Sequence, residues 1–320
     1  MPSTISHSLL QTIGKSLSAL ALTGGALFAN ATFADEHHQH AASYELVELK
    51  DNLYWLSGGK GGNILLSQGE DGMLLIDNDY LDMSQALEKV LKQFGGLSEV
   101  DFVINTHWHG DHTQNNVMLG ESSTIVAHRN VRERLSTPQE VPFFGMKSEP
   151  YAKAGLPDIT FKQQTTLHFN EHTIELMHFP LSHTDSDSVT FFEEANVVHM
   201  GDLFFNGFFP FIDVDNGGNV VNMANSIDAI LDIVDNDTVI VPGHGPIANK
   251  ADLAAFNQML KGTTKEVKAN KDKGMTLEQA QAAGLSDNWV EWTDGFIPVP
   301  AWIGIVYRSL QAKLQLYSYN

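Results

Sequence analysis

The sequence predicts an α/β fold: a four-layer αββα sandwich in which two mixed β-sheets pack face to face and helices cover their outer faces. Three observations predict it. Several strand-like apolar segments are followed by an amphipathic helix, and this order occurs twice along the chain. Histidine and aspartate residues stand in turns after several of these segments. The 320 residues are 42% hydrophobic, which is enough for one large core or two modest ones.

The chain begins with a pattern typical of a secretory signal peptide. Lys15 precedes the apolar stretch from Leu17 to Ala29, which is too short to span a bilayer as a stable helix. Small residues before Ala31 and Ala34 satisfy the small-x-Ala rule, so we expect cleavage after one of them. We therefore expect the protein to be exported, to the periplasm in a Gram-negative host, and to have no stable membrane insertion once residues 1–34 are cleaved. The alternative is a helical or disordered tail on a cytosolic protein.

Residues 35–43 open the expected mature chain and contain His37, His38 and His40. This segment is either a flexible polar terminus or a tail that gathers metal ions. For residues 44–320 we expect a single domain that ends in helices.

The composition excludes several classes of function. The net charge is −20 and the isoelectric point is near 4.9, so a polyanion such as nucleic acid would be repelled. Cysteine is absent, so the chain has no disulfide, no thiolate metal ligand and no thiol nucleophile. Any metal ion must therefore be held by histidine and carboxylate side chains.

The first half of the domain is predicted to contain two strand pairs, a helix and a further strand. Asp51-Asn52 and Gly69 to Gly72 are the turns of the two pairs. Asp82 is expected to cap the helix, whose apolar residues follow at helical spacing until Gly95-Gly96. The glycine-rich segment 58–62 lacks the Gly-Lys-Ser/Thr ending of a phosphate-binding loop. The predicted strands are 45–49, 53–56, 63–67, 73–76 and 100–104.

The second half repeats the order of strands and helices. Residues 135–157 contain four prolines and no clear period, which indicates a lid-type loop carrying Phe143 and Phe144. Amphipathic spacing predicts a helix over 220–234, and two C-terminal helices over 251–273 and 300–316 are expected to pack on the same body. The predicted strands are 123–127, 165–169, 173–179, 189–192, 197–199 and 238–241.

Residues 107–112 are His-Trp-His-Gly-Asp-His and follow the apolar run that ends at Ile104. Imidazole nitrogen and carboxylate oxygen bind zinc at roughly 2.0–2.2 Å. His107 and His109 alternate, so on an extended turn both can face one ion, while Asp111 and His112 can reach a second. The alternative is a polar turn whose histidines are merely exposed.

Three further candidate ligands, His183, Asp202 and His244, lie in turns after apolar runs, and glycine or proline stands beside most of them. Singly, each is more typical of a strand-end cap. In this order, and together with residues 107–112, they indicate a metal site.

These motifs resemble the metallo-β-lactamase-fold superfamily, whose signature is a His-x-His-x-Asp-His string followed by isolated His, Asp and His ligands. The resemblance spans residues 77 to 244 and implies two zinc ions per chain. Asp77 matches the family's first motif, an aspartate that orients the metal loop, although a strand-end cap fits it equally well. The implied ligands are His107, His109 and His183 for the first zinc, Asp111, His112 and His244 for the second, and Asp202 for both.

The resemblance also implies a reaction. A hydroxide shared by the two ions would attack a carbonyl carbon, and Asp111 would be catalytic by accepting its hydrogen bond or relaying its proton. The family's diiron branch carries glutamate where this chain has His109, so the resemblance favours zinc.

Aromatic residues near the ligands favour a bulky, weakly polar acyl substrate. Phe208, Phe209 and Phe211 are expected to form a wall of its pocket, while Trp108 and the pair Phe204-Phe205 fit the core equally well. No basic cluster is present that would bind a phosphate group. The sequence does not specify an oligomeric state.

Three functions stay open. The first, which we expect, is a metallo-β-lactamase that opens β-lactams and confers antibiotic resistance. The second is a lactonase or thioesterase, because β-lactamases of this family usually carry Cys or Ser in place of Asp202 and often Lys in place of Phe205. The third is a non-enzymatic periplasmic zinc-binding protein, which only the histidine-rich tail favours.

Overall fold

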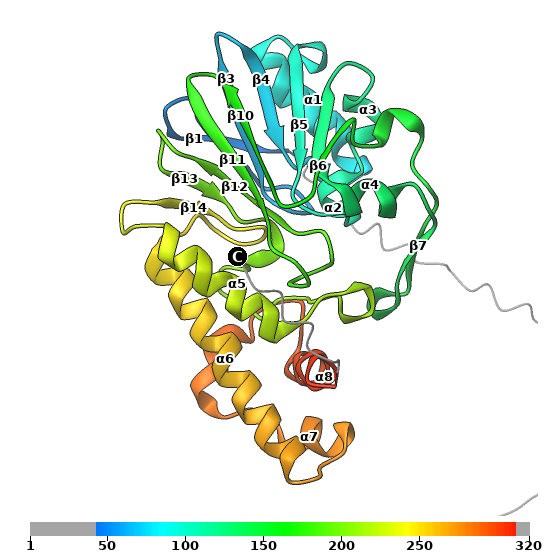
Figure 1. Ribbon diagram of the computed structural model, residues 1–320, viewed down its shortest axis with the longest axis vertical. Helices are drawn as coiled ribbons and strands as arrows, with labels where there is room; N and C mark the ends of the chain where they lie inside the picture. Colours follow the sequence, from blue (N-terminus) through cyan, green and yellow to red (C-terminus); the bar gives the residue numbers. More distant parts are fainter. Residues whose placement is uncertain (1–42, 312–320) are drawn as a thin grey trace, which may run out of the picture. The chain divides into compact units, whose positions relative to one another are not determined.

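The computed structural model describes residues 43–311, which lie in one compact unit. The expected signal peptide, all but the last residue of the histidine-rich segment, and the last turns of the helix predicted over 300–316 lie outside the described residues. The described chain has two mixed sheets with helices on their outer faces, which confirms the predicted sandwich (Figure 1).

The first sheet has seven strands, in the order β1-β2-β3-β4-β5-β6-β9. In this order, neighbouring strands from β1 to β4 are antiparallel, and neighbouring strands from β4 to β9 are parallel. Asp51 and Asn52, both at positive φ, make the predicted first turn. The strands are β1 (Glu45–Lys50), β2 (Leu53–Ser57), β3 (Ile64–Gly69), β4 (Gly72–Ile76), β5 (Val100–Asn105), β6 (Thr124–His128) and β9 (Ile159–Phe161).

The second sheet has five strands, in the order β10-β11-β12-β13-β14, and only its last pair is parallel. All five residues of its central strand β12 are buried, as expected where both faces of a sheet are covered. The strands are β10 (Gln164–Phe169), β11 (His172–His178), β12 (Ser188–Phe192), β13 (Val197–His199) and β14 (Val239–Val241).

Alternation along the strands sorts the apolar side chains into layers. In β4, Leu74 and Ile76 join a cluster with Ile174 of the second sheet, so they lie between the sheets. Their neighbours Met73 and Leu75 belong to the cluster that contains the buried face of helix α1. This separation follows from the two-residue period of a strand. The largest cluster lies between the second sheet and the C-terminal helices.

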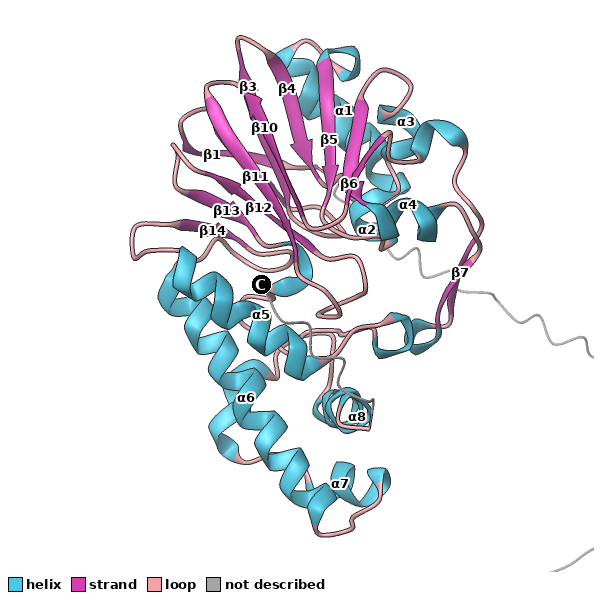
Figure 2. Cartoon of the chain, in the orientation of Figure 1, coloured by secondary structure: helices cyan, strands magenta, loops and turns pink. Residues whose placement is uncertain are grey.

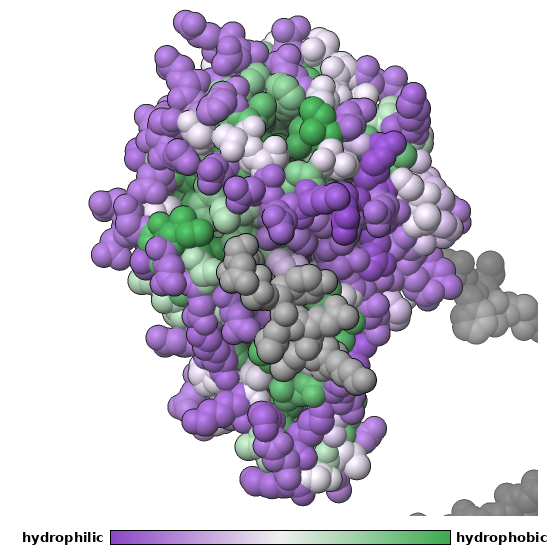
Figure 3. Space-filling view, viewed as in Figure 1, coloured by the Kyte–Doolittle hydropathy of each residue, from purple (hydrophilic) through white to green (hydrophobic). Residues whose placement is uncertain are grey.

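Helices lie on both outer faces (Figure 2). Helices α5, α6 and α8 pack beside the second sheet, and α6 begins with a capping box formed by Asn249 and Asp252. No described helix is both long enough and apolar enough to cross a bilayer. The face drawn in Figure 3 is largely hydrophilic. The helices are α1 (Ser84–Leu91), α2 (Gly110–Thr113), α3 (Asn116–Leu119), α4 (Arg129–Leu135), α5 (Val220–Ile233), α6 (Lys250–Asp272), α7 (Leu277–Ala283) and α8 (Val299–Ser309).

Two local predictions were wrong. Asp82 does not cap α1, because it lies in a preceding 3-10 turn, and its carboxylate pairs with the Lys60 ammonium at 2.5 Å. The segment 135–157 is not an irregular loop: β7 (Gln139–Val141) and β8 (Met146–Ser148) form a hairpin. Strands of three residues are too short to show an alternating pattern, so these two strands could not be predicted from the sequence.

The buried imidazole of His128 and the half-buried imidazole of His178 stack at the end of the sheets. The rings of His128 and His178 lie 3.7 Å apart at 6°. Burial, followed by the neighbouring His178, lowers the pKa of His128 to about 3, and burial lowers the pKa of His178 to about 4. The folded protein therefore holds both rings neutral at pH values where the unfolded chain, with its ordinary pKa of 6.5, takes up protons.

This pair is expected to make stability depend on pH. The contribution of the two neutral rings to the stability of the folded state is fully present above about pH 6.5. It is lost as the pH falls toward 4 and then 3, because only the unfolded chain binds protons in that range. His178→Phe should therefore flatten the fall in melting temperature between pH 7 and about pH 4. Substitution of the exposed His168 by Phe serves as the control. Equal slopes for His178→Phe and the unsubstituted protein would contradict the prediction.

Candidate metal centre

The seven side chains predicted as metal ligands meet where several strands end. Residues 107–112 follow β5: His107 and His109 lie in the turn between β5 and α2, and the one-turn helix α2 then carries Asp111 and His112. The other three lie in the segments that follow β11, β13 and β14, in that order, and they are His183, Asp202 and His244.

The first group of candidate ligands is His107, His109, His183 and Asp202, whose ligand atoms all lie within 4.8 Å of one another. All four side chains are buried. His183 Nε2 lies 2.9 Å from His109 Nδ1 and 3.3 Å from Asp202 Oδ2. Three imidazoles and one carboxylate form a donor set that suits zinc.

The second group is Asp111, His112, Asp202 and His244, again within 4.8 Å. His112 Nε2 and His244 Nε2 lie 3.1 and 3.4 Å from Asp202 Oδ1. Asp202 therefore presents one carboxylate oxygen to each group. The structure thus brings together all the residues that the sequence indicated, in the grouping that the resemblance implied.

Several ligand atoms lack partners of their own. His107 Nε2, His112 Nε2 and Asp202 Oδ1 are buried, and no hydrogen bond within the described chain satisfies them. Buried polar atoms without partners are rare, and a cation at the centre of each group would satisfy these. The donor set and its geometry therefore fit metal ions.

The charges around Asp202 are strongly coupled. Burial opposes its ionisation, but the charges on His112, His244 and His183 together outweigh burial and hold the pKa of Asp202 well below its usual range. Burial would lower the pKa of His244, but the Asp202 and Asp111 carboxylates together raise it to about 9. The carboxylate thus needs positive charge beside it, which either protonated imidazoles or cations can supply.

In three of the candidate histidines, the ring nitrogen that faces away from the centre has a polar partner outside the centre. His112 Nδ1 lies 2.7 Å from Asp77, whose carboxylate also accepts hydrogen bonds from the backbone and hydroxyl of Thr106. His109 Nε2 lies 3.0 Å from Asp213. His183 Nδ1 donates to the Phe211 carbonyl at 2.9 Å. Such partners fix the orientation of each ring and leave the other nitrogen directed at the other candidate ligands.

Sequence reasoning missed Asp213. It lies 104 positions from its partner His109 and in no strand-end turn. Its position directly after the apolar pair Phe211-Ile212 could have indicated a role, because a carboxylate buried among apolar residues needs a polar partner.

Two glycines allow the backbone to approach the ligands closely. A Cβ atom at Gly62 would lie 2.1 Å from the His112 ring, and one at Gly243 would lie 2.1 Å from Asp202 Oδ1. The glycine-rich segment 58–62 is thus part of the wall around the metal centre.

A cavity of about 460 Å³ opens onto four of the candidate ligands, His109, Asp111, Asp202 and His244. Trp108, Phe205 and Phe211 line it, together with Tyr80, Tyr151, the β7–β8 hairpin and Phe296. Phe205 stacks on His244 with ring centroids 5.0 Å apart.

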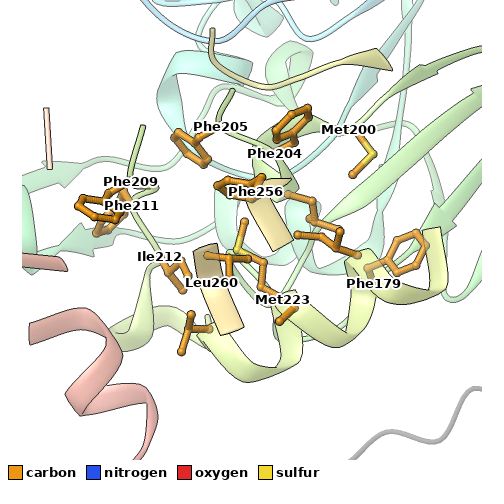
Figure 4. Packing of buried hydrophobic residues seen from close by; sticks show 14 of the residues in the cluster. Phe179, Met200, Phe204, Phe205, Phe209, Phe211, Ile212, Met223, Phe256 and Leu260 are labelled. Carbon is orange, nitrogen blue, oxygen red and sulfur yellow. The ribbon is translucent and has the colours of Figure 1, made fainter. Parts of the chain in front are cut away.

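Only part of the predicted aromatic wall is correct. Phe211 lines the cavity, but Phe209 is fully buried and stacks on Trp302 with ring centroids 5.5 Å apart. Phe204 is a core residue too, and Figure 4 shows its ring among the buried side chains that include Phe256. Phe204 and Phe209 thus lie in the core, whereas Phe205 and Phe211 line the cavity, and the predicted wall residue Phe208 does not line it.

The sequence profile of the metallo-beta-lactamase superfamily matches residues 58–244, which is more than half of the chain. The chain belongs to this superfamily. A protein described as a "probable metallo-hydrolase" from Methanocaldococcus jannaschii is 27% identical over 207 residues, which cover 62% of this chain and 89% of that protein.

Solved structures establish the same fold. The DIM-1 metallo-beta-lactamase has a TM-score of 0.54 and 17% identity, and the match covers 68% of this chain and 97% of that one. The inverting sec-alkylsulfatase Pisa1 from Pseudomonas sp. has a TM-score of 0.63 and 15% identity, and the match covers 83% of this chain and 50% of that one. At such identities the likeness concerns the fold alone.

Removal of the Asp213 carboxylate should weaken the first metal group. Asp213→Ala leaves His109 Nε2 without its 3.0 Å partner, so we expect zinc affinity at one site to fall by about 10–100-fold. Competition with a chromophoric chelator measures it. Asp215→Ala is the matched control, because Asp215 pairs with Arg308 instead. Equal affinities in both variants would contradict the assigned role.

Proposed function

We propose that the chain is a dizinc hydrolase that opens a carbonyl C–N bond, with β-lactams as its first substrate class. One observation carries the two-metal proposal: Oδ1 of Asp202 faces one ligand group and Oδ2 faces the other. A single carboxylate with this geometry suits two cations held side by side.

In the proposed reaction, zinc ions supply an activated water and a Lewis acid for the carbonyl oxygen. Water adds its oxygen to the carbonyl carbon, the C–N bond breaks, and a proton ends on the leaving nitrogen. Asp111 lines the cavity and lies 3.3 Å from His244 Nε2, where it can relay that proton from the water to the leaving nitrogen. Trp108, Phe205 and Phe211 are nearly inaccessible to solvent and exclude water from the carbonyl.

Two arguments support a β-lactam as substrate. The N-terminal pattern of residues 1–34 favours export, which would bring the enzyme to where β-lactams meet their targets. The apolar cavity over the ligands accommodates a bulky acyl compound. A strained four-membered lactam needs little beyond a positioned carbonyl, so Asp202 in the bridging position does not forbid the reaction.

A lactone or a thioester is the second candidate. The bridging Asp202 and the apolar Phe205, in place of the residues usual in β-lactamases, favour it. The same cavity and the same ligand groups would serve these substrates.

The zinc content of the protein tests the bridge. The purified chain should contain two zinc ions by elemental analysis. Asp202→Ala should lose zinc and at least a hundredfold in turnover, because the two sites lose their shared ligand. Asp202→Cys should retain part of the metal, since thiolate binds zinc well. Unchanged zinc content and turnover in Asp202→Ala would show that the ligand set is wrong.

The substrate proposal is tested with a chromogenic cephalosporin. The mature protein should open it, and a chelator should abolish the activity while serine-directed inhibitors leave it intact. A lactone and a thioester serve as comparison substrates. If either has a kcat/KM a thousandfold higher, the second candidate replaces the first. A zinc-loaded protein inert to all three would be a zinc-binding protein.

A further inference from the structure

Large apolar side chains are exposed around the cavity. Phe144 is 45% exposed, Met146 is 44% exposed and Phe296 is 52% exposed, and all three line it. Phe144 and Met146 come from the β7–β8 hairpin, whereas Phe296 precedes α8, about 150 positions away. Apolar residues gathered from distant segments around one cavity mark a ligand-binding surface rather than scattered exposure.

The exposed rings connect to both ligand groups. The ring centroids of Phe144 and Phe296 lie 6.4 Å apart. Phe144 lies 4.7 Å from Phe211, which in turn lies 5.9 Å from His109 of the first group. Phe296 lies 6.3 Å from His244 of the second group. Phe296 therefore contacts His244 directly, whereas Phe144 is connected to His109 through the ring of Phe211.

The lysine side chains near these rings are paired with carboxylates, so they attract an ionic group only weakly. Lys60 and Lys147 are the lysines among the described residues that line the cavity. Lys60 pairs with Asp82 at 2.5 Å, and Lys147 pairs with Glu140 at 3.4 Å. A neutral group gains more here, since burying an unpaired charge beside apolar rings is unfavourable.

We propose that Phe144 and Phe296 form an aromatic subsite that binds a neutral aryl substituent of the substrate close to the scissile bond. The effect of this subsite on substrate hydrolysis rests on the proposed function. The binding of an aryl group to it rests on the cavity alone. An aryl ring packs on phenylalanine rings at centroid distances of about 4.5–7 Å. Bound substrate would cover the exposed faces of both rings and exclude water from the carbonyl below.

Selectivity between paired substrates tests the subsite. A penicillin nucleus with a phenylacetyl side chain is compared with the same nucleus carrying acetyl. The ratio of their kcat/KM values should fall about tenfold in Phe144→Ala and in Phe296→Ala. Phe296→Leu should retain part of the ratio. Val290→Ala is the control, because Val290 is 69% exposed and does not line the cavity. A ratio unchanged in both phenylalanine variants would overturn the proposal.

A binding measurement separates this inference from the proposed reaction. The neutral aryl probe N-phenyl-1-naphthylamine should gain fluorescence with the purified chain and with Val290→Ala, but lose at least tenfold in affinity with either phenylalanine variant. This result would support the subsite even if no lactam were opened. Equal probe affinity in all variants would overturn the subsite even if lactams were hydrolysed. Circular dichroism should show that the variants fold, because both rings are exposed.

Discussion

The carboxylate of Asp202 is 4% exposed and lies within 3.9 Å of four imidazoles, those of His107, His112, His183 and His244. A buried charge of this kind is strongly unfavourable unless positive charge and hydrogen-bond donors surround it. The surrounding groups come from segments that lie far apart along the chain. The fold must therefore place several strand ends within a few ångströms of one another, and most other features of the centre follow from this requirement.

The sandwich meets this requirement through its two sheets. Strand β5 of the first sheet delivers residues 107–112, and β13 and β14 of the second deliver Asp202 and His244. The apolar layer between the sheets, with fully buried Ile76 and Ile174, sets how closely these strand ends approach. The positions of the ligands are thus fixed by packing that lies away from the ligands themselves.

The sequence predicted the sheets, the main helices and the clustering of the seven candidate ligands because each has a local signature. Periodicity reveals strands and helices, and a dense string of histidine and aspartate on a loop is typical of a metal site. Asp213 and Phe296 lack such signatures. Their roles arise from proximity to His109 and His244, which the chain reaches only after folding. The same holds for the β7–β8 hairpin, whose strands are three residues long, and for Phe209, whose direction depends on Trp302.

The segment after β4 shows how carboxylates outside the centre control its geometry. Asp77 and Asp79 have φ values of 59° and 64°, a left-handed conformation that few residues besides glycine adopt. Asp77 accepts hydrogen bonds from Thr106 and contacts His112, while Asp79 accepts from the Gly61 backbone and from the Tyr44 hydroxyl. These bonds compensate the strain. Because Gly61 is anchored in this way, its neighbour Gly62 is held against the His112 ring. One short strained segment therefore fixes the same histidine in two ways, through its Nδ1 atom and through the close approach of Gly62 to its ring.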